Sequence, residues 1–172
     1  MRYGDKKPKI IRSIIFCLLI SAAVFIQNTA WHLPLPGSPR VFIALPLAVC
    51  ISMFEREIAS ALFGAFTGVL WDISSGADGF NALVIMLLCA VCSVLVSRIM
   101  RNNIVTSLVL SAGACAVYIF VYILVFTVLS GGGFAPGALL AFYLPALALT
   151  VIAAVPLYFA VRAISLNYKT DE

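Results

Sequence analysis

Apolar residues fill most of the chain in six runs, and short segments between the runs hold nearly all of the charged residues. Such runs are typical of membrane-crossing helices, because the hydrocarbon core of a bilayer requires about 20 apolar residues per helix. The second and third runs are shorter, so they would be little tilted, be extended by their flanking residues, or lie where the bilayer is thin. A re-entrant hairpin of these two runs is less favoured, because it would break the alternation of basic segments. The favoured prediction is an all-α integral membrane bundle of six transmembrane helices, at about residues 10–31, 41–54, 58–73, 80–96, 104–129 and 138–161.

The composition supports a single polytopic membrane domain over residues 1–172. Hydrophobic residues make up 63% of the chain and charged residues 10%, whereas about a quarter of the residues in ordinary soluble domains are charged. The apolar runs leave no room for a separate soluble domain.

The basic residues predict the orientation of the bundle. Ten of the eleven lie in alternate segments, namely the amino terminus, the second loop, the fourth loop and the carboxyl-terminal tail. By the positive-inside rule, both termini are cytoplasmic and the number of crossings is even. The net charge of +4 therefore reports topology and gives no reason to expect nucleic-acid binding.

One carboxylate, Asp72, ends the third apolar run. Ser60, Gly64, Gly68 and Asp72 are spaced four residues apart, so they share one face of a helix. Small residues allow helices in membranes to approach closely, and we expect Gly64 and Gly68 to pack against a neighbouring helix. Asp72 itself has two interpretations. It accepts hydrogen bonds from amides of residues 74–76, or it clamps the third and fourth helices and contributes to a partner or ligand surface.

The segment after Asp72 predicts a tight turn. Gly76 and Gly79 permit backbone conformations that other residues avoid, so the chain can return at once into the fourth helix. We therefore expect Asp72 and Asn81 to come close together.

The remaining polar residues do not form a catalytic pattern. His32 is the only histidine, and Cys89 and Cys92 form a C-x-x-C with no second pair or nearby histidine to complete a metal site. Tyr118 and Tyr122 either line a pocket or pack against neighbours with each hydroxyl bonded to a backbone carbonyl, and packing is favoured. We expect no enzyme activity, cofactor or metal.

The run from residue 64 to residue 83 resembles the MreD family of bacterial rod shape-determining membrane proteins. The shared pattern is G-x-x-x-G-x-x-x-D-x-x-x-G-x-x-G-x-x-A-L, at Gly64, Gly68, Asp72, Gly76, Gly79, Ala82 and Leu83. Chain length, six apolar runs and a basic amino terminus agree in outline. Trp71 departs from the pattern, since the family commonly has an aliphatic residue there.

The resemblance implies a non-enzymatic scaffold in the bacterial cytoplasmic (inner) membrane. Such a scaffold would bind MreC and, through the complex, the MreB filament and RodA with its class B penicillin-binding protein. The assembly organises peptidoglycan synthesis and cell shape. The lipid bilayer is a further partner, and both self-association and the binding of a small ligand or lipid stay open.

The resemblance also suggests an alternative function, because MreD proteins are similar in fold to the S-components of energy-coupling-factor transporters. An S-component that captures a vitamin needs converging polar and aromatic groups in its outer half. The candidates here are Gln27, Asn28, Trp31, His32, Asp72 and Asn81. S-components also tend to carry Ala-x-x-x-Ala on the first helix, but Ala22 and Ala23 are followed here by Ile26 and Gln27. The scaffold is therefore favoured.

Overall fold

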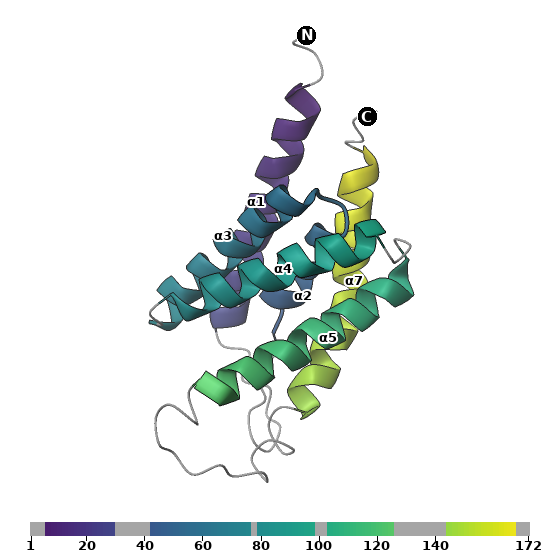
Figure 1. The fold of residues 1–172 in the computed structure, drawn as a ribbon. Helices are drawn as coiled ribbons and strands as arrows, with labels where there is room; N and C mark the ends of the chain where they lie inside the picture. The colour runs from purple at the N-terminus through teal and green to yellow at the C-terminus, as the bar shows by residue number, and fades with distance from the viewer. Residues whose placement is uncertain (1–5, 30–41, 77–78, 99–102, 126–143, 168–172) are drawn as a thin grey trace.

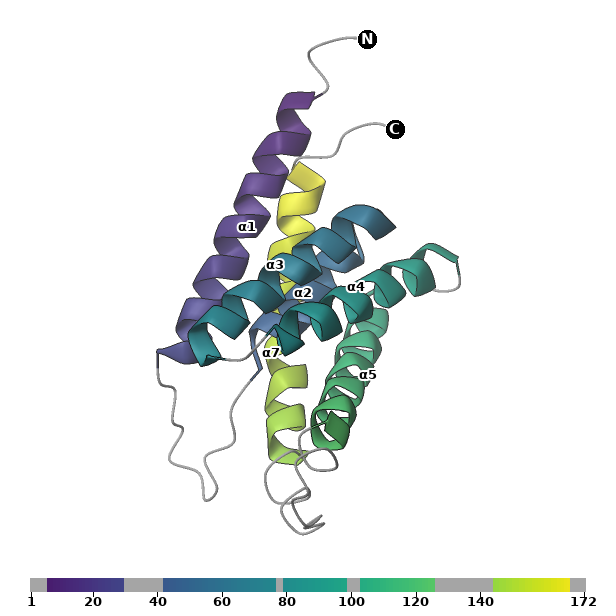
Figure 2. The ribbon, with the colours of Figure 1, turned by 60° about the vertical axis from the view of Figure 1, so that its left-hand side comes forward.

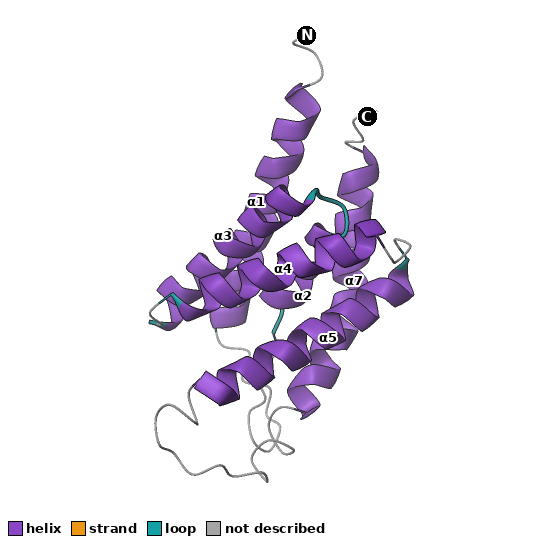
Figure 3. Ribbon diagram, in the orientation of Figure 1, coloured by secondary structure: helices purple, strands orange, loops and turns teal. Residues whose placement is uncertain are grey.

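The computed structural model describes residues 6–29, 42–76, 79–98, 103–125 and 144–167, and this part of the chain is helical with no strand (Figure 3). Its helices are α1 (Lys6–Asn28), α2 (Ala44–Ser52), α3 (Glu57–Ser75), α4 (Phe80–Arg98), α5 (Ile104–Ile123) and α7 (Leu144–Asn167). The start of α1 and the end of α7 lie at the same end of the bundle (Figure 1).

Among the described residues, five helices are long and apolar enough to cross a membrane: α1, α3, α4, α5 and α7. The shortest of them, α3 and α4, have 19 residues each, which corresponds to about 28 Å of helix against about 30 Å of hydrocarbon. Large apolar side chains such as Leu18, Ile73 and Phe120 are exposed on the outside of the bundle, as expected for surfaces that meet lipid. The prediction of a multi-pass all-α membrane protein is confirmed.

The second predicted span differs from the structure. In place of a crossing helix over residues 41–54, the chain forms α2, whose nine residues are all buried. Nine residues make about 13 Å of helix, which is too short to cross a bilayer. α2 contacts all five long helices and lies behind the α3–α4 pair in both views (Figures 1 and 2). A helix that is apolar on every side is suited to a protein interior. Of the six predicted transmembrane helices, five are therefore confirmed as helices long and apolar enough to cross, and the second is a short buried helix.

The predicted boundaries of the long helices also shift. α3 continues two residues past the expected end at Ile73, and α7 ends at Asn167 instead of near Val161. Hydropathy marks the apolar part of a helix, whereas the helix itself continues into polar residues that still favour the helical backbone. Residues 126–143, which include the expected end of the fifth span and start of the sixth, lie outside the described residues.

An ion pair joins three parts of the fold near the start of α1. Arg12 Nη2 lies 2.6 Å from Glu55 Oε1, and both side chains are largely buried. The Ser93 hydroxyl of α4 donates a hydrogen bond of 2.9 Å to the Glu55 carbonyl. The connection between α2 and α3 is thus fixed to both α1 and α4.

Candidate functional site at the contact of α3 and α4

The backbones of α3 and α4 touch along the row of small residues predicted from the sequence. A Cβ atom added at Gly68 would lie 2.3 Å from Ala82 Cα, and one at Gly64 would lie 2.8 Å from Cys89 Cβ and 2.9 Å from the Ile85 carbonyl oxygen. No real side chain tolerates such distances to backbone atoms. Glycine is therefore required at Gly68 and favoured at Gly64. We call this contact the α3–α4 seam.

Hydrogen bonds close the seam at both ends. At one end the Ser60 hydroxyl donates to the Cys89 carbonyl of α4 at 2.8 Å. At the other end Asp72 bonds to the beginning of α4. All four residues of the predicted row, spaced along almost the whole of α3, therefore face α4, and the seam is continuous.

Asp72 caps the amino terminus of α4. Its Oδ1 accepts the amide of Asn81 at 3.1 Å, and its Oδ2 accepts the amide of Ala82 at 2.8 Å. Both amides belong to the first turn of a helix that begins at Phe80, where backbone donors have no partner within the helix. The carboxylate also lies next to the positive end of the helix dipole. Asp72 thus joins α3 to α4, and the alternative in which it bonds the amides of residues 74–76 is wrong.

Two glycines shape the turn that brings Asp72 to α4. Gly76 has φ 67° and Gly79 has φ 79°, both in the left-handed region that favours glycine. Gly76 ends α3, with its amide donating to the Asp72 carbonyl, and the Gly79 carbonyl accepts the amide of Leu83 as α4 begins. The expected closeness of Asp72 and Asn81 follows from this turn.

A buried side-chain bond extends the seam to α5. The Tyr118 hydroxyl donates to Asn81 Oδ1 at 2.6 Å, and both residues are buried. The Tyr118 ring stacks on Trp71 at a centroid distance of 5.5 Å and meets Phe42 edge-on at 5.7 Å. The packing interpretation of Tyr118 is supported, but its partner is a side chain where a backbone carbonyl was expected.

A second cap of the same kind holds α2. The Gln27 side chain of α1 accepts the amides of Ile43 and Ala44 at 2.8 and 2.9 Å. The Thr150 hydroxyl of α7 accepts the amide of Phe42 at 3.2 Å. Side chains of two neighbouring helices therefore satisfy the donors at the start of α2. The sequence placed Gln27 only among the polar groups of the outer half.

The other sequence candidates take part in packing or lie elsewhere. Cys89 forms part of the seam and Cys92 is buried in the core. Within the described ranges, no three His, Cys, Asp or Glu side chains are grouped so that they could hold a metal ion. His32 lies outside the described residues. The site is suited to holding three helices in register.

The family model of the rod shape-determining protein MreD matches residues 7–166 of the chain. The matched range includes the whole α3–α4 seam and nearly all of the described helices. No curated protein and no solved structure matches the chain.

Proposed function

The chain belongs to the MreD family of rod shape-determining proteins, and we propose that it serves rod-shape determination as a non-enzymatic membrane scaffold. The observation that supports a scaffold is the use of Asp72. Both of its carboxylate oxygens accept backbone amides of α4, so the one acid in the family-like pattern holds helices together. Gly68 and the turn glycines serve the same contact.

We propose MreC as the direct partner. The protein would then contact the MreB filament and RodA with its class B penicillin-binding protein indirectly, through the complex with MreC. The complex would organise peptidoglycan synthesis. The proposed location is the bacterial cytoplasmic membrane with both termini in the cytoplasm. The basic residues of the amino terminus and of the carboxyl-terminal tail support this orientation. The fold agrees with it, since the start of α1 and the end of α7 share one end of the bundle.

The scaffold is better supported than the vitamin-binding S-component. A ligand pocket needs polar groups that are available to the ligand. Three of the six candidates for such groups are Gln27, Asp72 and Asn81. Each of them instead uses an oxygen atom to accept a hydrogen bond within the bundle.

Affinity purification tests the proposal. The tagged protein is isolated in mild detergent from cells that also express MreC of the same bacterium, and bound proteins and small molecules are identified by mass spectrometry. We expect MreC near one-to-one stoichiometry and no stoichiometric small molecule.

Gly113→Ala is the control variant for this purification, because a Cβ at this exposed position of α5 would meet nothing within 4 Å. This variant should recover MreC like the wild type. Recovery of a stoichiometric vitamin without MreC, from protein that is monodisperse on size exclusion, would overturn the scaffold.

A further inference from the structure

Residues 42–55, which contain α2, are bonded to α1 at both ends. The Ile43 amide donates to Gln27 Oε1 near the end of α1, and the Glu55 carboxylate is paired with Arg12 near its start. Arg12 and Gln27 are 15 residues apart, which corresponds to about 22 Å along the helix. The segment therefore runs antiparallel to α1 over most of the thickness of a hydrocarbon core, which is about 30 Å.

The segment is long enough for this distance, although α2 alone is not. The eight residue steps within α2 rise about 12 Å. Between the two contacts there are four further steps, one before α2 and three after it, and each can add up to about 3.3 Å. The whole segment can thus reach about 25 Å, which exceeds the distance between its two contacts on α1.

α7 gives the segment the same direction. The Phe42 amide donates to the Thr150 hydroxyl at 3.2 Å, and the Phe54 ring lies 6.0 Å from the ring of Tyr158, eight residues further along α7. The segment therefore runs beside α7 and parallel to it. Since α7 ends where α1 begins (Figure 1), the segment also leads toward the start of α1.

The parts of the segment outside α2 have protein partners for their backbone polar groups. Side chains of α1 and α7 accept the amides of residues 42–44. The amides of Met53 and Phe54 donate to carbonyls at the end of α2, and the Glu55 carbonyl accepts the Ser93 hydroxyl of α4. Irregular backbone is tolerated at membrane depth only where protein satisfies it in this way.

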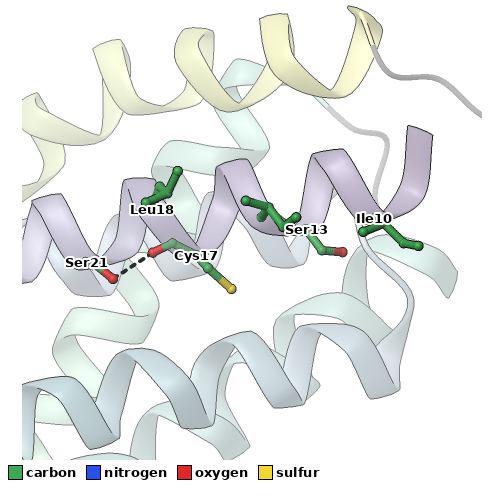
Figure 4. A pocket seen from close by; sticks show the side chains of 6 residues that line it. Ile10, Ser13, Cys17, Leu18 and Ser21 are labelled. Carbon is green, nitrogen blue, oxygen red and sulfur yellow. Dashed lines mark hydrogen bonds between the residues drawn. The ribbon is translucent and has the colours of Figure 1, made fainter. Parts of the chain in front are cut away.

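α1 covers the segment on one side of the bundle. The inner face of α1, which includes Phe16 and Ile20, is fully buried. The outer face carries a shallow groove lined by residues of α1 alone (Figure 4), and Ile14 and Leu18 there are more than half exposed. Lipid therefore meets the outer face of α1, whereas all nine residues of α2 are buried within the bundle.

We infer that residues 42–55 are a sixth crossing of the membrane, made inside the protein, which returns the chain to the side where α1 begins. A re-entrant segment would instead return the chain to the side where α1 ends. The inference fixes relative sides only, so it depends neither on the scaffold function nor on which side is cytoplasmic. It also means that a partner within the membrane does not contact α2.

Cysteine labelling of sealed, uniformly oriented membrane vesicles tests the crossing. Thr29→Cys lies directly after α1, Glu57→Cys begins α3 and Ser75→Cys ends it, and all three positions are exposed. The five native cysteines are buried or half-buried, so the wild type provides the background. A permeant maleimide should label all three variants.

An impermeant maleimide separates the two topologies. We expect it to label Thr29→Cys and Ser75→Cys from one side of the membrane and Glu57→Cys only from the other. Labelling of Thr29→Cys and Glu57→Cys from the same side would show that the segment does not cross, and would overturn the inference.

Two leucines test whether the crossing runs inside the protein. Leu47 of α2 is fully buried, whereas Leu83 of α4 is 58% exposed. Leu47→Ala leaves a cavity and should lower the thermal unfolding midpoint in detergent by about 5–10 °C. Leu83→Ala should lower it by less than about 2 °C, because apolar surroundings contact this side chain before and after unfolding. Equal shifts would show that α2 meets lipid as α4 does, and would overturn the internal course.

Discussion

Gly68→Ala is the substitution that most directly tests the α3–α4 seam. The added Cβ would lie 2.3 Å from Ala82 Cα, 2.6 Å from the Ala82 amide nitrogen and 2.6 Å from the Asn81 carbonyl oxygen. All three are backbone atoms, so no side chain can rotate away to make room. The two helices must separate, and the separation also stretches the bonds from Asp72 to the first turn of α4.

The expected loss of stability is about 4 kcal/mol. Forcing a methyl group into a packed interface costs roughly 2 kcal/mol. Loss of the two hydrogen bonds to the Asp72 carboxylate, which the separation stretches beyond bonding distance, adds about 3 kcal/mol. Replacing glycine by alanine within a helix returns about 1 kcal/mol. For a chain of this size, 4 kcal/mol corresponds to a fall of roughly 10 °C in the unfolding midpoint.

Thermal unfolding in detergent, followed by far-ultraviolet circular dichroism, measures this change. Gly113→Ala adds the same methyl group in open space and should raise the midpoint slightly. Gly64→Ala should give a smaller loss of about 1–2 kcal/mol, because its contacts are longer and one is to the Cys89 thiol. The reasoning fails if Gly68→Ala unfolds within 2 °C of the wild type, or if Gly113→Ala falls as far as Gly68→Ala.

Asp72→Ala should lower the free energy of unfolding by about 3 kcal/mol, because one buried and one partly buried amide lose their acceptor. Asp72→Asn should lower it less, since the amide oxygen replaces one bond, and equal losses in the unfolding assay would contradict capping. Tyr118→Phe should cost about 1–2 kcal/mol by leaving Asn81 Oδ1 buried without its donor, and a midpoint unchanged from the wild type would show that this bond adds nothing. Gln27→Leu should lower stability by about 2 kcal/mol by uncapping α2, whereas Gln27→Glu, which keeps an acceptor, should recover part of the loss.

The seam was predictable from the sequence because it depends on local geometry. A four-residue spacing fixes which residues share a helix face, and small residues in a membrane helix indicate where another helix approaches. Gly76 and Gly79 limited the turn to a few residues, so α4 was the obvious neighbour of Gly68.

The partners of the polar side chains were not predictable in the same way. The bond from Tyr118 to Asn81 and the cap from Gln27 to α2 depend on the relative height of helices that are distant in the sequence. Hydropathy does not encode that height. Nor does hydropathy distinguish a short helix buried in protein from a short helix that meets lipid, which is why α2 was expected to cross the membrane by itself.

The two caps have one physical cause. The first backbone amides of a helix have no partner within it, and side chains of neighbouring helices accept those of α2 and α4. Gln27 does this for α2 with a neutral amide, and Asp72 does it for α4 with a carboxylate whose charge is stabilised by the helix end. The capping of α4 by Asp72 requires the close approach of α3 and α4 that Gly68 permits and the turn that Gly76 and Gly79 permit. The acid and the glycines of the family-like pattern therefore act as one structural unit. Losing any one of them weakens the contact between α3 and α4 that the others maintain.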